Sequence, residues 1–152
     1  MTAAAALRPA TPADYDAIAA VVDTWWGRPV LPSLPRLFLD HFHRTSLIAS
    51  TDPGELAGFL IGFPSPSAED EAYIHFVGVS PASRGTGLAR GLYEAFFAIA
   101  REHGRHVVKA ITSPVNEGSI AFHRRMGFTV GGPHPAYNGP GTTLITFERT
   151  LP

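Results

Sequence analysis

The clearest chemical signal is a glycine-rich turn, Arg84-Gly85-Thr86-Gly87-Leu88-Ala89, placed between an apolar strand pattern and a helical one. Amide N–H groups at a helix start have no acceptor within the helix, and the helix dipole favours an anion there. Glycines let a phosphate approach the backbone, and Arg84 adds positive charge. The turn therefore predicts a phosphate or pyrophosphate site, the alternative being a turn that merely starts a helix.

Two other nucleotide-binding motifs do not match this turn. No lysine follows the glycines, as a Walker loop requires, and the spacing is not the dinucleotide pattern Gly-x-Gly-x-x-Gly. The turn alone thus predicts phosphate binding without naming the nucleotide.

The elements on either side of the turn form a strand, helix, strand unit. A strand is expected over Ala72 to Val79, and apolar residues at helical spacing predict a helix from Leu88 that stops at Gly104. Val107 to Thr112 reads as the next strand. Such a unit places its two strands parallel and side by side.

The remaining pattern predicts further strands and helices on both sides of this unit. Helices are expected over Pro12 to Asp23, Pro35 to Phe42 and Ser119 to Met126, the first ending before Trp25-Trp26. Strands are expected at Leu7 to Pro9, Ser46 to Ala49, Leu56 to Phe63, from Phe128 to Val130 and over Thr142 to Thr150, with Thr51-Asp52-Pro53-Gly54 closing a hairpin. The fold class is α/β (α+β): a mixed, mainly antiparallel sheet of six or seven strands with about four helices, in one domain over residues 1–152.

Composition excludes several classes of partner. The chain has 152 residues and a net charge of −1, so it offers no basic surface for nucleic acid or an anionic membrane. No stretch has the roughly 18 apolar residues of a membrane span. The absence of cysteine removes disulfides and thiolate chemistry and fits the cytoplasm. His41 and His43 lack the spacing of a helical metal pair, so no metal is expected.

The glycine turn in its context resembles motif A of the GNAT N-acetyltransferase family, which runs strand, Arg-Gly-x-Gly-x-Gly/Ala, helix. The resemblance implies that the amides from Arg84 to Ala89 cradle the pyrophosphate of acetyl-CoA. It also implies that the main chain of Val77, Gly78 and Val79 pairs with the pantetheine arm. Members often carry Gln or Arg where this chain has Ala82.

A second segment, Asn116 to Phe128, looks like the family's motif B, which ends in Gly-Phe. The resemblance implies cofactor contacts from Asn116, Ser119 and Phe122. It places His123 where many members have a tyrosine that reprotonates the CoA thiolate. The alternatives are a helix-capping role for Asn116 and a solvated helix position for His123.

The resemblance implies direct transfer of acetyl to an amine, with the main-chain N–H around Val79 as oxyanion donor. His75 is the candidate base: strand alternation puts it on the face of Tyr73, Val77 and Val79, and some members use a histidine there. The alternative is a hydrogen-bonded sheet histidine without a catalytic role.

Aromatic residues are the candidates for the acceptor site. The first helices border that site in similar proteins, so Trp25, Trp26 and Phe38 are candidates to line it. Large aromatics are more often core residues, and at least one tryptophan is expected in the core. Tyr73 takes roughly the place of a base glutamate in other members. Tyr137 lies in the loop Tyr137 to Gly141, which would close over the acceptor or form an ordinary hairpin loop.

The predicted function is an N-acetyltransferase that acts on a primary amine of a small molecule, amino acid or peptide. The alternative is a non-catalytic acyl-CoA-binding regulatory module, motivated by Ala82 and His123; a longer acyl donor also stays open. The lack of an acidic cluster in the sequence is a weak argument against polycationic acceptors. Edge strands would allow a homodimer, which nothing in the sequence requires.

Overall fold

The computed structural model describes residues 5–51 and 54–152, so Asp52 and Pro53 of the predicted turn lie outside the described residues. The chain forms two compact units. The first unit consists of Met1–Phe63 and Phe76–Ile99, and the second of Pro64–His75 and Ala100–Pro152. Strand β4 (Glu71–Val79) contributes residues to both. The single domain expected over residues 1–152 stays a prediction.

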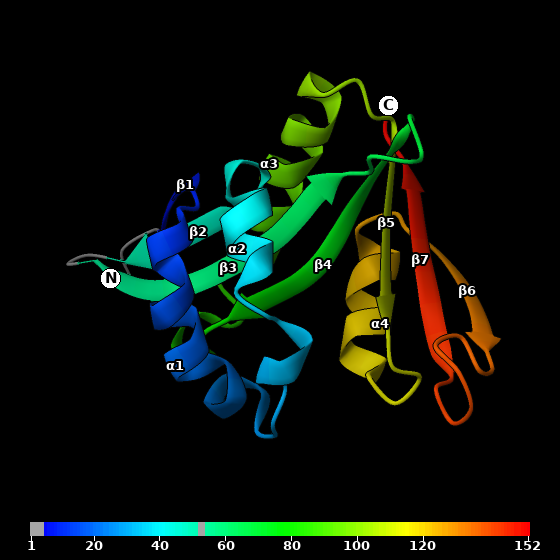
Figure 1. Cartoon of the computed structure of the whole chain (residues 1–152), viewed down its shortest axis with the longest axis horizontal. Coiled ribbons are helices and arrows are strands. Elements are labelled where there is room, and N and C mark those ends of the chain that lie inside the picture. The colour runs from blue at the N-terminus through cyan, green and yellow to red at the C-terminus, as the bar shows by residue number, and fades with distance from the viewer. Residues whose placement is uncertain (1–4, 52–53) are drawn as a thin grey trace. The chain divides into compact units, whose positions relative to one another are not determined.

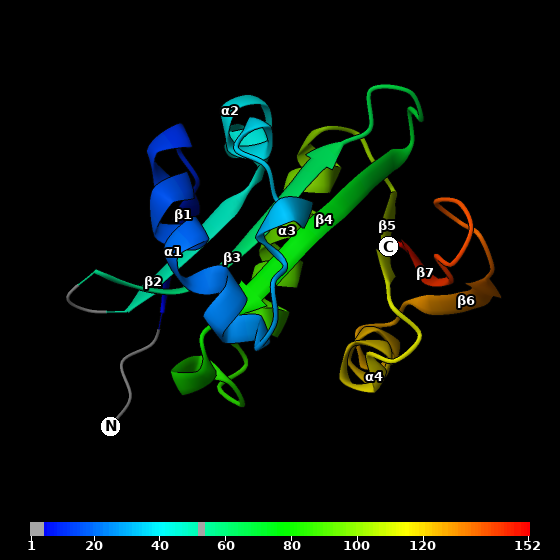
Figure 2. The same cartoon turned by 60° about the horizontal axis from the view of Figure 1, so that its bottom comes forward.

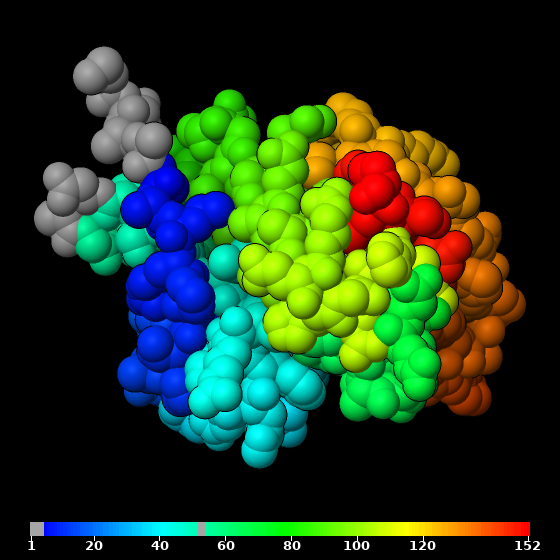
Figure 3. Space-filling model, turned by 90° about the horizontal axis from the view of Figure 1, so that it is seen from above, coloured from blue at the N-terminus to red at the C-terminus, as the bar shows by residue number. Residues whose placement is uncertain are grey.

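The first unit is a sheet covered by helices on both faces. Its strand order is β1 (Ala6–Pro9), β2 (Leu47–Thr51), β3 (Glu55–Pro64) and then β4, with β1–β2 and β2–β3 antiparallel. Helices α1 (Tyr15–Trp26) and α2 (Leu37–Phe42) lie over one face, and α3 (Leu88–Glu102) lies over the other (Figures 1 and 2). Figure 3 shows the segments of α1 (blue) and α2 (cyan) side by side at the surface.

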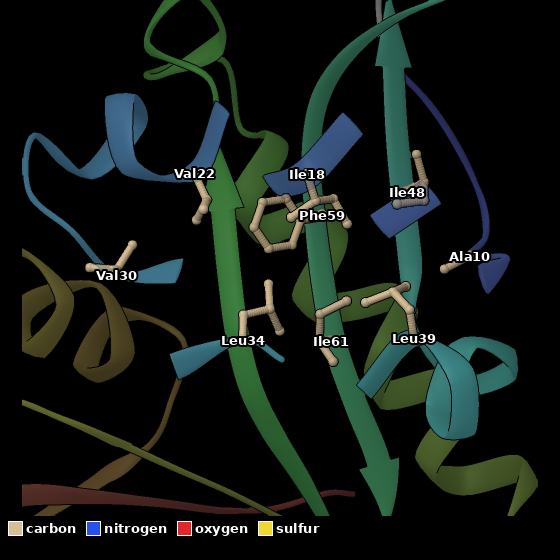
Figure 4. Close-up of a cluster of buried hydrophobic side chains, with 9 residues drawn as sticks. All are labelled: Ala10, Ile18, Val22, Val30, Leu34, Leu39, Ile48, Phe59 and Ile61. Carbon is tan, nitrogen blue, oxygen red and sulfur yellow. The ribbon is translucent and has the colours of Figure 1, made fainter. Parts of the chain in front are cut away.

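The core of the first unit lies between the sheet and helices α1 and α2. Ile18 and Val22 are one helical turn apart on α1 and are fully buried. They face Phe59 and Ile61, which alternate along β3 (Figure 4). Burying one such side chain contributes roughly 1.5–3 kcal/mol, so this cluster is what holds α1 on the sheet.

Two glycines allow close packing on opposite faces of this sheet. A Cβ atom on Gly78 would lie 2.6 Å from Phe59 Cε1 and 3.1 Å from Trp26 Cζ3. A Cβ on Gly58 would lie 2.9 Å from the carbonyl oxygen of Gly78 and 3.2 Å from Leu88 Cδ2. The sheet therefore meets α1 and α3 at positions where no side chain fits.

The second unit has the strand order β4, β5 (Val107–Thr112), β7 (Leu144–Thr150) and β6 (Thr129–His134). Strand β5 runs parallel to β4 and antiparallel to β7, and β7 runs antiparallel to β6. Helix α4 (Glu117–Arg125) packs on this sheet through the ring of His123, which stacks on Phe147 of β7. Val108, Ala110 and Phe128 are buried with them.

The fold class is confirmed: within residues 5–51 and 54–152, seven strands form a mixed, mostly antiparallel sheet with four α-helices. The predicted hairpin of β2 and β3 and the parallel pair of β4 and β5 are both present.

The first helix differs from its prediction at both ends. Residues Pro12–Asp14 form a 3₁₀ turn, held by an ion pair of 2.7 Å between Arg8 and Asp14, so α1 begins only at Tyr15. The break expected before Trp25 is wrong. Helix α1 continues through Trp26 and ends at Gly27, whose φ of 73° is a helix-terminating left-handed conformation.

Candidate active site

The predicted phosphate turn joins β4 to α3 within the first unit. Pro81–Ser83 form a 3₁₀ turn, Gly85 and Gly87 have φ of 75° and 85°, and α3 begins at Leu88. The first ladder bond runs from the Gly91 N–H to the Gly87 carbonyl at 3.0 Å. The amides of residues 88–90 precede that ladder and have no acceptor inside the helix. They are anion donors by their position in the fold.

The turn has open space beside its glycines. An added Cβ would meet no heavy atom within 4 Å at Gly85 or at Gly87. The hydroxyl of Thr86 donates to the Ser83 carbonyl at 2.5 Å and fixes the loop between the two glycines. The turn thus combines backbone donors, a helix dipole and room for a phosphate.

Arg84 has a partner that its place in the sequence did not indicate. Its Nη2 donates to the carbonyl oxygen of Trp25 at 2.7 Å. Trp25 lies in the last turn of α1, where carbonyl groups lack helical partners and the dipole favours a cation. Arg84 therefore ties the phosphate turn to the end of α1, and its positive charge stays beside the turn.

The two tryptophans pack against the core of the first unit. Trp25 stacks on Phe59 with ring centroids 6.1 Å apart, and Trp26 lies 4.7 Å from the ring of Phe76. Both are half-buried and pack against the buried cluster without being fully buried members of it. A substrate contact from their exposed parts stays a prediction.

Strand β4 shows the predicted alternation at its two ends. Half-buried Tyr73 lies between buried Ala72 and Ile74, and buried Gly78 lies between half-buried Val77 and Val79. His75, Phe76 and Val77 are all half-buried, so the burial pattern does not alternate in the middle of the strand. The roles of His75 as base and of the Val79 N–H as oxyanion donor stay predictions.

Asn116, Ser119 and His123 form one chain of contacts at α4. Asn116 is the N-cap: its side-chain oxygen accepts the Ser119 N–H at 3.2 Å, so the capping alternative is confirmed. Its side-chain amide also donates to the Thr112 hydroxyl at 3.3 Å. The Ser119 hydroxyl lies 3.3 Å from His123 Nδ1. Cofactor contacts from Asn116, Ser119 and Phe122 are not tested by these bonds.

His123 is buried, which contradicts the alternative of a solvated histidine. Only 5% of its surface is exposed, and its ring stacks on Phe147 with centroids 3.8 Å apart. Its Nδ1 lies 2.7 Å from the Ser119 carbonyl, which can only accept, so Nδ1 carries a proton. Burial lowers the pKa of His123, and the bond to Ser119 partly offsets this. The ring is therefore neutral at pH 7 with Nε2 as an acceptor.

The second unit contains a pocket of about 260 Å³. Its lining comes from β4, β5, β6, β7 and the loop between β6 and β7: Tyr73, Lys109, Ala110, Ile111, His134, Tyr137, Thr146, Phe147 and Glu148. Two predicted acceptor-site residues, Tyr73 and Tyr137, thus meet here. Burial raises the pKa of Tyr73 to about 12, so its hydroxyl is protonated at neutral pH.

Sequence reasoning missed the polar members of this pocket. Lys109, His134 and Glu148 lie on three strands that pairing brings together. The alternation of Lys109 with the apolar residues Val108 and Ala110 was a signal, but its use required knowledge of which strand pairs with which. The loop from Tyr137 joins the antiparallel strands β6 and β7, so it is a hairpin loop as one alternative held.

Metal-ligand groups and membrane-spanning helices are considered for the described residues. Within residues 5–51 and 54–152, no three His, Cys, Asp or Glu side chains are grouped so that they could hold a metal ion. No helix in that part of the chain has the length and apolar character needed to cross a bilayer.

Comparison with known proteins shows which family the chain resembles in sequence and which solved structures share its fold. Residues 15–128 match the model of the acetyltransferase (GNAT) family, which is more than half of the chain. The protein yncA of Salmonella typhimurium, solved with its cofactor acetyl-CoA, has a similar fold: the TM-score is 0.74 at 24% identity, over 97% of this chain and 94% of that one. The segment that matches the family model, residues 15–128, includes the phosphate turn and α4.

Two curated relatives have named acceptors. The chain is 31% identical over 90 residues to the L-2,4-diaminobutyric acid acetyltransferase of Halomonas elongata, which is 59% of this chain and 47% of that protein. It is 36% identical over 91 residues to the L-methionine sulfoximine/L-methionine sulfone acetyltransferase of Pseudomonas paraeruginosa, 59% of this chain and 53% of that protein. The matches thus span about half the length of these relatives.

Proposed function

Because the chain belongs to the acetyltransferase (GNAT) family, we propose that it transfers an acetyl group from acetyl-CoA to a primary amine of a small molecule. One observation carries the proposal: the positive-φ turn with open space at the start of α3. Its arrangement of unpaired helix amides beside Arg84 suits a pyrophosphate such as that of CoA.

The residues of the turn fit the donor in size and in charge. The amides of Leu88 and Ala89 would hold one phosphate at the helix start, and Gly85 and Gly87 leave room for its oxygens. The main chain of Val77 and Val79 would pair with the pantetheine arm. Acetyl-CoA supplies an activated acyl group, so the chain needs no nucleophile of its own.

In the proposed reaction the acceptor nitrogen forms a bond to the thioester carbonyl, and the bond to sulfur breaks. His75 accepts the amine proton directly or through water, and the N–H around Val79 stabilises the oxyanion. The departing thiolate takes a proton. A half-buried histidine on β4 is suited to the first of these tasks.

His123 is not suited to the final protonation in the tautomer that its contact with the Ser119 carbonyl implies. An acid needs a proton at Nε2, and the lowered pKa disfavours that form. The contacts of His123 support a positioning role instead, holding α4 against Phe147. This is also the observation that favours the second candidate, a protein that binds acyl-CoA without turnover.

Two measurements test the proposal. In a calorimetric titration, acetyl-CoA should bind at micromolar strength, and dephospho-CoA and ATP serve as controls for CoA specificity. A thiol-release assay with amino acids and small diamines should then show acceptor-dependent turnover. Tight binding with no turnover on any primary amine would favour the non-catalytic candidate, and no binding by folded protein would overturn both.

A further inference from the structure

The pocket of the second unit has a charge that the sequence does not reveal. Lys109 Nζ lies 2.9 Å from a carboxylate oxygen of Glu71 and 3.5 Å from one of Glu148. The two carboxylates keep the pKa of Lys109 above its ordinary value, chiefly through the bond to Glu71. Lys109 and Glu148 line the pocket, whereas Glu71 is outside the lining and is joined to it by the ion pair with Lys109. The three groups together carry a charge of −1. Residues 71 and 148 are far apart in the chain, so no acidic cluster is visible in the sequence.

The remaining wall is aromatic. The rings of His134 and Tyr137 have centroids 6.2 Å apart, and Tyr73 lines the same pocket. The Tyr73 hydroxyl is neutral at physiological pH, and burial raises its pKa further, to about 12. Aromatic faces beside a net negative charge attract organic cations. A volume of about 260 Å³ holds an alkylammonium group and is below the range of sites for whole cofactors.

The pocket also has a defined place relative to the candidate base. Tyr73 precedes His75 by two residues on the same side of β4, which separates them by roughly 7 Å along the strand. If His75 accepts the proton of the reacting amine, the pocket lies where a more distant part of the acceptor would be.

We infer that this pocket binds a cationic group of the acceptor, an alkylammonium remote from the amine that is acetylated. The acceptor class is then a diamine or a basic amino acid. The assignment to an acceptor rests on the proposed function, whereas binding of a cation by the pocket does not.

Cation binding is tested without catalysis. Choline is titrated into the protein and followed by NMR, with 3,3-dimethylbutan-1-ol as its neutral isostere. Choline should bind and the alcohol should bind at least several-fold more weakly. Glu148→Gln should weaken choline binding about three-fold, and Lys109→Met should strengthen it by a similar factor, because each removes one charge of opposite sign. Glu94→Gln, which removes a carboxylate ion-paired with Arg90 on α3, should change nothing.

The opposite signs of the two variants decide the question. Weaker binding in Lys109→Met, equal binding of the alcohol, or no binding of choline to the wild-type protein would overturn the inference. Circular dichroism of each variant shows whether it is folded, and Lys109→Gln replaces Lys109→Met if that variant is not.

A second arm separates this inference from the proposed function. Thiol release is compared for 1,4-diaminobutane and butylamine at saturating acetyl-CoA. The diamine should have the lower KM, and Glu148→Gln should remove that advantage. Turnover of butylamine as efficient as that of the diamine would keep the proposed function and reject the cationic acceptor. Absence of turnover with both would reject the function, while the choline result stands by itself.

Discussion

The imidazole of His123 stacks on the ring of Phe147 with centroids 3.8 Å apart and planes within 5° of parallel. The contact joins α4 to β7, and the bond from Nδ1 to the Ser119 carbonyl holds the ring in this orientation. The rings of Phe122 and Phe128 pack edge-on against the same imidazole. The contribution of a histidine in such an apolar site to the stability of the fold depends on pH.

Protonation of His123 should destabilise the folded protein. Burial lowers its folded pKa, so between the ordinary value of about 6.5 and the lower folded value the unfolded chain binds a proton that the folded one does not. The contribution of neutral His123 to the free energy of unfolding is fully present above about pH 6.5 and is lost as the pH falls through the folded pKa. Urea unfolding should give a smaller free energy of unfolding at pH 5.5 than at pH 7.5.

His123→Phe isolates this contribution. Phenylalanine keeps an aromatic face on Phe147 but cannot be protonated, so the variant should lose less free energy between pH 7.5 and pH 5.5 than the wild type does. His41→Ala, on an exposed position of α2, should retain the wild-type dependence. Equal losses in His123→Phe and the wild type would show that other groups cause the acid destabilisation.

Local patterns in the sequence predicted the elements that depend only on neighbouring residues. Strand β5 has the predicted bounds, Val107 to Thr112, and α3 begins at the residue after Gly87. Positive φ at Gly85 and Gly87 is what the turn required. This segment lies within residues 15–128, which match the family model.

Features that depend on distant pairing were not predictable. His123 precedes Arg124 and Arg125 and looked exposed, yet its burial is decided by Phe147 on a strand that follows much later. The charge of the pocket likewise depends on the register that places Lys109 opposite Glu148. A single sequence does not supply that register.

Gly87 should be sensitive to charge more than to size. Gly87→Asp and Gly87→Asn add side chains of the same shape, and both residues tolerate the left-handed φ of 85°. Only aspartate adds a negative charge where the phosphate binds. Calorimetry should show acetyl-CoA affinity about ten-fold weaker for Asp than for Asn, a difference of ~1.4 kcal/mol that shrinks with added KCl. Equal affinities at low salt would refute an anion site at this turn.

His75→Ala should lower kcat with little change in acetyl-CoA affinity. General base catalysis contributes ~10²-fold or more, so we expect a loss of about that size, largest at low pH where the amine is protonated. Added imidazole should restore part of the rate, since it supplies the missing base. His41→Ala is the matched control and should be fully active. Full turnover in His75→Ala would leave His75 a structural residue of β4.

Opposite effects on stability are expected for Gly→Ala changes at Gly78, where α1 packs on the sheet, and at Gly91 in α3. A methyl group at Gly78 would lie 2.6 Å from Phe59 Cε1 and 3.1 Å from Trp26 Cζ3; Phe59 is fully buried, and Trp26 packs against the core. Overpacking of this kind costs about 1–3 kcal/mol, so Gly78→Ala should lower the free energy of unfolding by that amount.

Gly91, within α3, has no heavy atom within 4 Å of an added Cβ beyond its own helix and neighbours. Alanine is the better helix former, so Gly91→Ala should raise the free energy of unfolding by roughly 0.5–1 kcal/mol. Urea unfolding of both variants at pH 7.5 checks the pair. A neutral Gly78→Ala would mean that Trp26 can shift away from β4, and the Arg84 bond to the Trp25 carbonyl would then be expected to weaken with it, because the two tryptophans are adjacent in α1.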